Sequence, residues 1–334
     1  MNKNNKIFDI YEVVTNQIIE ILETHKKLSF TKTWFPVSGE IFANNPVSGS
    51  VYQGLNQLIL CFLAIKRGYT QNRWLTVNQS KQFDVYPRKG ERGCIVTYVS
   101  RMFKNEKTGR NITNHVLEIL QAGGTVPEGV ETIPYLKWYK VFNLDQFAEG
   151  LPEKLFFHGE SISFSEPEKD LAAEEYINLT GATIKYIPYS ENLYTLLSRQ
   201  QKANFYCPDT DTIQLTERSQ FKEKAGFYRT AFHELGHWSG HKTRLNRNLS
   251  GEFGTPEYAK EELIAELFSA FTAAHCGFAS QITNNAAYIH SWLKCLKDDK
   301  KFIFQASGKA QEAAKFVSNL VASKIGEPVL MDQI

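Results

Sequence analysis

The residues best suited to chemistry form the motif His233-Glu234-Leu235-Gly236-His237, which has the spacing H-E-x-x-H. The surrounding pattern is typical of a helix, and residues four apart in a helix lie on the same face. His233 and His237 can therefore offer two imidazoles to one zinc ion, with Glu234 beside them. Because zinc lowers the pKa of bound water, Glu234 could take a proton from that water and deliver it to a leaving amine.

The competing interpretation of the motif is a helix that carries two surface histidines. Random placement of 8 histidines in 334 residues would produce an H-E-x-x-H motif in roughly one or two per cent of such chains. The sequence downstream also supports a metal site, so we favour zinc.

A catalytic zinc site needs a third protein ligand and keeps one position open. The metzincin pattern places a histidine six residues after His237, where this chain has Thr243, and His241 comes two residues early. The only methionine further along is Met331, so no Met-turn is available. We therefore expect a glutamate from a later helix.

The segment from Tyr258 to Phe271 supplies that glutamate. Its apolar residues recur at helical spacing: Leu263, Leu267, Ala270 and Phe271. Glu262 and Glu266 lie one turn apart on this partly apolar helix, where carboxylates are costly unless something pairs with them. We predict Glu262 as the zinc ligand and Glu266 as the acceptor of a hydrogen bond from a zinc-bound histidine. The exchanged roles and a solvated acidic face are the alternatives, and Glu261 is expected to be exposed.

Length and composition describe a globular protein with two domains. The chain has 334 residues, of which 42% are hydrophobic and 13% aromatic. The opening residues 1–6 are polar and no apolar region follows, so we expect no signal peptide. The longest apolar run, residues 55–65, is too short to span a bilayer. The five cysteines form no C-x-x-C pair, which is typical of core thiols in a reducing cytoplasm.

The charge is distributed unevenly along the chain. Residues 1–150 contain 18 Lys and Arg against 13 Asp and Glu, whereas the remainder contains 20 against 23. A basic first half and an acidic second half favour a polyanionic partner for the first half.

The first half has the pattern of an α+β domain with a curved sheet. We expect helices at residues 7–22 and 52–66, an irregular loop at 28–51, and strands that begin at 74 and span 95–99, 115–120 and 138–142. The loop carries Trp34, which is either an anchor in the core or a stacking surface. The turn at residues 86–93 is basic and has aromatic neighbours, as single-stranded nucleic acid binding requires. A solvated hairpin is the alternative for this turn.

In the second half we expect a linker at 151–170 and then a domain at 171–334. Strands are predicted at 184–187 and 203–206, and helices at 286–296 and 309–321. Side chains alternate along residues 211–215, which precede the H-E-x-x-H helix. We expect either an edge strand that pairs with an extended substrate or a plain structural strand.

Several motifs extend over nearly the whole chain in one order. In the first half they are Ile10-Tyr11, Gly49-x-x-Tyr52-x-Gly54-x-Asn56, Trp74-Leu75-Thr76-x-x-Gln79, Arg88-Lys89-Gly90-Glu91 and Val141-Phe142-Asn143-x-x-Gln146. In the second half they are Phe205-Tyr206, Asp211-x-Ile213, the segment Ala231 to Trp238, Arg244-Leu245-x-Arg247 and the segment Tyr258 to Glu266. Through these motifs the chain resembles the ArdC-type antirestriction proteins of plasmids. One departure is Leu28-Ser29-Phe30, followed by Thr33-Trp34, where the family tends to have a Pro-Trp pair.

The resemblance implies single-stranded DNA binding by residues 1–150 and zinc binding by a zincin-like domain of the H-E-x-x-H…E type. It also implies a role in conjugative transfer, in which incoming DNA is shielded from restriction enzymes. The candidate DNA-binding residues are Trp34, Tyr52, Asn56, Arg73, Trp74, Lys89 and Arg92.

Three functions follow from these patterns. The first is a zinc metallopeptidase that cuts a DNA-bound protein, and the second is a DNA-binding protein whose zinc is structural. The third, a metal-dependent nuclease, is least favoured because no second carboxylate cluster is present. Glu234 favours the first over the second, since a structural zinc has no use for a carboxylate beside an open position.

Overall fold

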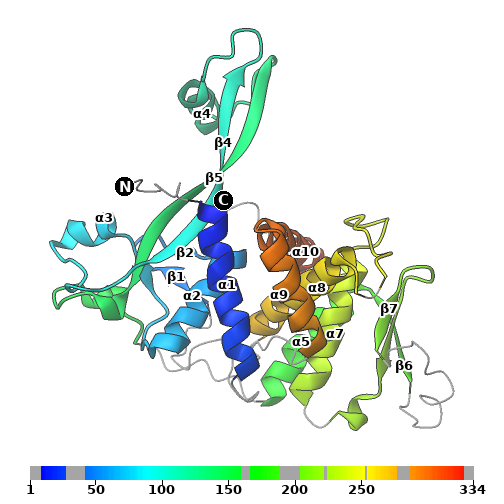
Figure 1. Cartoon of the computed structure of the whole chain (residues 1–334). Helices are drawn as coiled ribbons and strands as arrows, with labels where there is room; N and C mark the ends of the chain where they lie inside the picture. The colour runs from blue at the N-terminus through cyan, green and yellow to red at the C-terminus, as the bar shows by residue number, and fades with distance from the viewer. Residues whose placement is uncertain are drawn as a thin grey trace, which may run out of the picture. The chain divides into compact units, whose positions relative to one another are not determined.

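The computed structural model describes residues 9–27, 42–158, 166–187, 204–221, 224–252, 254–276 and 286–326. They form two compact units of an α+β fold: Met1–Arg73 together with Glu153–Ile334, and Trp74–Pro152 (Figure 1). The division that we predict near residue 150 lies close to the C-terminal limit of the second unit. The first 73 residues, however, belong to the same unit as the C-terminal helices.

The unit Trp74–Pro152 is built on an antiparallel sheet of order β3-β5-β4. Its strands are β3 (Trp74–Leu75), β4 (Cys94–Asn105) and β5 (Val130–Asn143), and the last two form the long ribbon in Figure 1. The short helices are α3 (Val77–Ser80), η1 (Lys81–Phe83) and η2 (Leu144–Gln146). Reciprocal hydrogen bonds between Thr76 and Gln79 cap α3, which explains why the chain turns immediately after β3.

The strand that we predict at residues 115–120 is wrong, because these residues lie in helix α4 (Thr113–Gln121). Val116, Ile119 and Leu120 recur at helical spacing, and Val116 is fully buried. Val116 and Ile119 are β-branched and favour strands, but tertiary burial of one helical face outweighs that preference. The Thr113 hydroxyl accepts a 2.9 Å hydrogen bond from the Phe103 amide, which ties α4 to β4.

In the other unit, the N-terminal segment packs with the C-terminal helices. It consists of α1 (Ile10–Lys27), β1 (Asn44–Asn45), β2 (Ser50–Val51) and α2 (Gly54–Arg67). The Thr15 hydroxyl donates to the Lys300 carbonyl at 2.8 Å, and the Tyr11 and Phe304 ring centroids are 5.0 Å apart. The helices that α1 and α2 contact are α9 (Ala286–Asp298) and α10 (Phe302–Ile325).

The rest of this unit has a three-stranded sheet of order β6-β8-β7 and a set of helices. The strands are β6 (Thr183–Ile187), β7 (Phe205–Cys207) and β8 (Thr212–Thr216). The helices are η3 (Glu153–Leu155), α5 (Glu166–Thr180), η4 (Arg218–Gln220), α7 (Lys224–Ser239) and α8 (Pro256–His275). The core joins the sheet to the helices through Ile213, Phe232 and Phe268, each fully buried.

Of the two interpretations of residues 211–215, the edge strand is wrong and the plain structural strand is the one observed. Strand β8 lies in the centre, parallel to β6 on one side and antiparallel to β7 on the other. Strand β6 pairs along all of β8, and β7 pairs with residues 212–214, so at these positions the backbone of β8 is occupied within the sheet and is not open to an extended substrate. Among the described residues, no helix is long and apolar enough to cross a membrane.

Candidate metal centre

Helices α7 and α8 position the residues of the H-E-x-x-H motif and the later glutamate. In α7, Phe232 and Leu235 are buried in the core, and the helical spacing places His233 and His237 together on another face. A Cβ added to Gly236 would lie 2.8 Å from the Ala265 Cα atom of α8, closer than real contacts allow. The glycine therefore permits the close approach of α7 and α8 on which the site depends.

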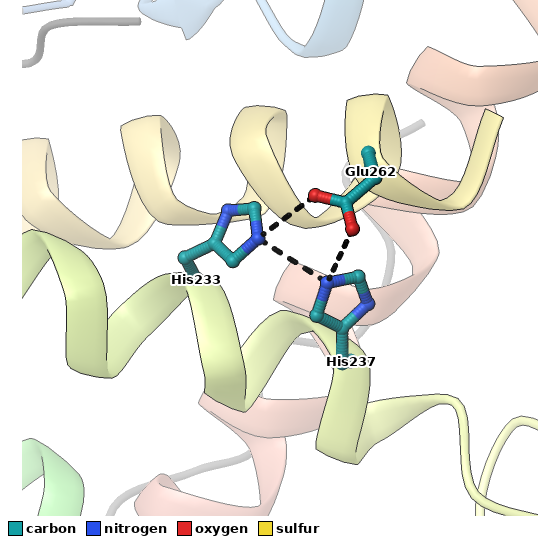
Figure 2. A group of neighbouring side chains, drawn as sticks. All are labelled: His233, His237 and Glu262. Atoms are coloured by element: carbon teal, nitrogen blue, oxygen red, sulfur yellow. Dashed lines mark hydrogen bonds and ion pairs between the residues drawn. The ribbon is translucent and has the colours of Figure 1, made fainter. Parts of the chain in front are cut away.

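The ligand atoms of His233, His237 and Glu262 converge between the two helices (Figure 2). The two Nε2 atoms are 3.2 Å apart, and the Glu262 carboxylate oxygens lie 3.4 Å from Nε2 of His233 and 3.9 Å from Nε2 of His237. Tetrahedral zinc with bonds of about 2.0–2.1 Å separates neighbouring ligand atoms by about 3.3 Å. The donor set and its spacing therefore fit a divalent metal held by three protein ligands.

The other ring nitrogen of each histidine faces a buried carboxylate of α8. Nδ1 of His233 is 3.0 Å from Glu266 Oε2, and Nδ1 of His237 is 3.1 Å from Glu261 Oε1. A carboxylate at Nδ1 keeps the proton there, so that the Nε2 lone pair is available to a metal. The structure thus places Glu266 beside a histidine, in the position that the hydrogen-bond role requires.

The expectation that Glu261 is exposed is wrong, because its side chain is buried beside His237 and Arg247. Arg247 contacts both Glu261 oxygens, at 3.0 Å through Nε and 2.8 Å through Nη2. It also donates to the Ser239 hydroxyl and the Gly236 carbonyl of α7. Arg247 therefore ties α7 to α8 behind the metal ligands, a role that helical spacing alone does not indicate.

Buried acids dominate the electrostatics of the site. Burial opposes a positive charge on His233, but Glu262 and Glu266 outweigh it and raise the pKa of His233 well above its usual value. Burial also opposes the charge of Glu261, yet His237 and Arg247 hold the pKa of its carboxyl below the usual value. Glu234 adds a further buried carboxylate on α7. The site therefore favours a cation, and a divalent metal satisfies this charge together with the donor geometry.

Three of the candidate DNA-binding residues are buried or make contacts within the protein. Trp74, a candidate for the DNA surface, is fully buried, so its ring is not accessible to DNA in this conformation. Tyr52 is also buried. The Arg73 guanidinium donates to the Leu155 carbonyl at 2.7 Å and lies 5.6 Å from the Phe157 ring centroid. Burying an aromatic ring in the core stabilises the fold, and a ring that is buried in this way is not available to a ligand.

The remaining candidates differ in position. Asn56 is half-buried in α2, whereas Lys89 and Arg92 are exposed in the turn that precedes β4. Lys89 and Arg92 are therefore accessible to phosphates. Trp34 lies outside the described residues.

Comparison with known proteins assigns the family. Residues 8–142 match the model for the N-terminal domain of anti-restriction factor ArdC, and residues 189–309 match a zincin-like metallopeptidase model. The metal-free crystal structure of the ArdC antirestriction protein from plasmid R388 is 31% identical, with a TM-score of 0.68 over 95% of this chain and 99% of that one. The chain belongs to the ArdC antirestriction family.

Other relatives support the same assignment. The Mn(II)-bound structure of R388 ArdC is 32% identical, with a TM-score of 0.67 over 94% of this chain and 99% of that one. The uncharacterized protein y4eC of Sinorhizobium fredii (strain NBRC 101917 / NGR234) is 31% identical over 92% of this chain and 91% of its own length. Together with the convergent donor set, the Mn(II)-bound relative indicates a divalent metal site in this ArdC-family chain.

Two Escherichia coli proteins named DNA primase TraC also match. They are 31% and 32% identical over 97% and 92% of this chain, which spans only 28% and 20% of their length. The ArdC-family chain therefore corresponds to a part of these longer proteins.

Proposed function

We propose that this chain is a single-stranded-DNA-binding antirestriction protein of a mobile element with a zinc-dependent metallopeptidase unit. It would protect or process nucleoprotein during DNA transfer, in the cytoplasm, and its substrate would be a DNA-bound protein. The observation that carries the enzymatic part is the convergence of His233, His237 and Glu262, with a buried carboxylate behind each histidine. Two imidazoles and one carboxylate suit zinc, whereas manganese favours oxygen donors.

A catalytic role for the metal is favoured over a structural one by the number of ligands. Structural zinc sites close all four positions with protein side chains, whereas catalytic sites keep one open. Among the described residues, the group of side chains that converges as metal ligands has three members, His233, His237 and Glu262. It does not include a fourth ligand from a Cys or His residue. Bound zinc supplies a Lewis acid that activates water or polarises a carbonyl.

In this proposal each residue of the chain has a distinct role. His233, His237 and Glu262 hold the cation, while Glu266 and Glu261 orient the imidazoles. Glu234 takes a proton from the attacking water and delivers it to the leaving amine, which requires a carboxylate beside the ligands.

Replacing Glu234 with Gln separates catalysis from metal binding. The variant should keep one zinc per chain, measured by elemental mass spectrometry, because Glu234 is not a ligand. Its cleavage of denatured casein in the presence of single-stranded DNA should fall by about 10²–10⁴-fold, the usual contribution of a general base. Cleavage equal to that of the parent would exclude this mechanism. A parent that binds zinc and single-stranded DNA without cleaving would favour the alternative of a structural zinc.

The nucleic-acid half of the proposal predicts a preference for single strands. The logarithm of the affinity for an oligo-dT should fall linearly with the logarithm of the salt concentration, because bound phosphates release counterions. Fluorescence anisotropy with single-stranded and duplex oligonucleotides of equal length measures both properties. Equal affinity for the two would contradict base stacking.

A further inference from the structure

We propose that one face of the β4–β5 ribbon is a stacking surface for the bases of single-stranded DNA. This surface, the tyrosine–lysine face, consists of Tyr98 in β4 and Tyr135, Lys137 and Tyr139 in β5. The inference rests on the proposed function and gives its DNA-binding part a location. The tryptophan that the sequence favoured, Trp74, is buried and cannot serve this purpose in the conformation described.

The strand register brings these side chains to one face. Tyr98 is paired with Lys137, Ser100 with Tyr135, and Val96 with Tyr139. Directly paired residues share a face of an antiparallel sheet, and side chains alternate between faces along each strand. The Tyr98 and Tyr139 ring centroids are 5.8 Å apart.

Lys137 stands between the rings of this face. Its ammonium nitrogen lies 6.0 Å from the Tyr98 ring centroid and 5.3 Å from that of Tyr135. A cation held among aromatic rings can contact a phosphate while the adjacent rings remain available to bases.

The three tyrosine rings of this face are exposed to solvent. Tyr98, Tyr135 and Tyr139 are 45%, 38% and 36% exposed, although burial of such large rings would stabilise the fold. At the base of the ribbon, the same face is buried at Cys94 and Val141. The exposed rings therefore begin where the ribbon leaves the core of its unit, and a cluster of exposed rings marks a binding surface.

The charge of this part of the ribbon favours nucleic acid as the occupant. Residues 94–101 and 134–143 include three basic side chains and no acidic one: Lys137 lies on the tyrosine–lysine face, and Arg101 and Lys140 lie on the opposite face of the ribbon. Protein–protein interfaces are depleted of lysine at their centre, whereas single-strand binding sites combine rings with basic side chains. Along β5, the rings of Tyr135 and Tyr139 are four residues apart, or about 13 Å, with Lys137 between them, so the two rings can meet different bases of an extended strand.

Substitution of the tyrosines in the full-length protein tests the surface. With a fluorescein-labelled dT20 oligonucleotide, Tyr98→Ala and Tyr135→Ala should each raise Kd by about 5-fold or more, as expected for loss of a stacked base. Tyr98→Phe should keep the affinity near that of the parent, because the ring is retained. Lys137→Ala should reduce the slope of log affinity against log salt by about 0.7, the value for one phosphate contact on a single strand.

Tyr186 provides a matched control, because it is an exposed tyrosine in a strand of the other unit. Tyr186→Ala should bind dT20 as the parent does. Unchanged affinity of the Tyr98 and Tyr135 variants, with a parent that binds dT20, would overturn the stacking surface and leave the proposed function intact. A parent that does not bind dT20 would overturn the DNA-binding part of the proposed function as well.

A second measurement needs no substitution. In the parent protein, saturating dT20 should slow acetylation of Lys137, followed by mass spectrometry of peptides, while Lys185 beside Tyr186 should react at an unchanged rate. Equal acetylation of Lys137 with and without the oligonucleotide would overturn the proposal even if the alanine variants failed to fold.

Discussion

At the scale of single residues, the candidate metal centre includes two carboxylates that lie behind the proposed ligands. Glu261 and Glu266 each face the Nδ1 atom of a ligand histidine at about hydrogen-bonding distance, 3.1 and 3.0 Å. Glu261 is in turn held by two contacts from Arg247, whose side chain is only 5% exposed. The orientation of His237 is therefore determined by a chain of buried polar contacts that ends at Arg247.

Removing the charge of Glu261 tests this chain of contacts. Glu261→Gln should weaken zinc binding by about 10–100-fold, the usual cost of losing a partner of a ligand histidine. Competition with a chromophoric chelator measures the affinity. Asp211→Asn removes a carboxylate that is paired with Arg244 instead, and should leave zinc affinity unchanged. Equal zinc affinity in Glu261→Gln and the parent would mean that Glu261 only joins the helices.

Asp211 allows a prediction about pH. Hydrogen bonds from Arg244 are the largest cause that holds the pKa of the Asp211 carboxyl at about 2. Since this folded-state pKa lies below the unfolded value, the interaction stabilises the fold above about pH 4 and is lost as the pH falls towards 2. The side chain is 40% exposed, so the effect is small. In metal-free protein, Asp211→Asn should lower Tm at pH 7 more than at pH 3; equal differences would contradict the linkage.

At the scale of elements, the distance between α7 and α8 determines whether the metal ligands meet. Gly236 lies at a point of close approach to Ala265, between the two histidines in sequence. Any side chain there must push against the backbone of Ala265. The glycine of the motif therefore has a packing role in addition to the chemistry of its neighbours.

Gly236→Ala should consequently destabilise the protein despite the better helix propensity of alanine. Overpacking typically costs about 1–3 kcal/mol, and separation of the helices should also weaken zinc binding. Urea unfolding measures the stability. The control is Gly308→Ala in α10, where an added Cβ meets nothing within 4 Å; it should gain about 0.5–1 kcal/mol. Increased stability in both variants would show that α7 and α8 can move apart without a loss of stability.

At the scale of the whole molecule, the metal would join two helices of the unit that also contains α1 and α10. Its three ligands come from α7 and α8, and Arg247 lies in the connection between these helices. The same unit contains α1 and α2, which pack with α9 and α10. A ligand that binds only the folded state stabilises the whole cooperative unit.

Zinc removal should therefore lower the stability of the protein as a whole. With free zinc at 100 times Kd, the stabilisation is about 2.7 kcal/mol. Thermal unfolding across a zinc titration, starting from chelator-treated protein, should show a rising Tm. The Tm of the His237→Ala variant should not change over the same range of zinc concentrations. A parent Tm that is independent of zinc would contradict a metal centre between α7 and α8.

Local sequence patterns predicted much of the second half of the chain. Helical spacing placed His233 and His237 on one face, and the cost of two carboxylates on an apolar helix pointed to Glu262 and Glu266. Both predictions depend on the periodicity of a single helix, which local sequence is enough to indicate. The structure brings Glu262 to the two histidines and Glu266 to His233.

Local patterns could not predict the features that depend on contacts between segments distant in sequence. Burial of Glu261 follows from Arg247, 14 residues earlier in the chain, and the central place of β8 follows from strands on both sides. Trp74 is buried because β3 pairs with β5, residues about 70 positions further along.

The sequence by itself therefore determined the H-E-x-x-H spacing, the glutamate proposed as third ligand and the α+β class, because each rests on residue type and local spacing. Only the tertiary structure decided which aromatic rings are available to a ligand. Ring exposure is set by strand register and packing, and a one-residue difference in register exchanges the two faces of a strand. Trp74 lies in the core because β3 packs there, whereas Tyr98 and Tyr135 face solvent because they lie beyond the point at which the β4–β5 ribbon leaves the core of its unit.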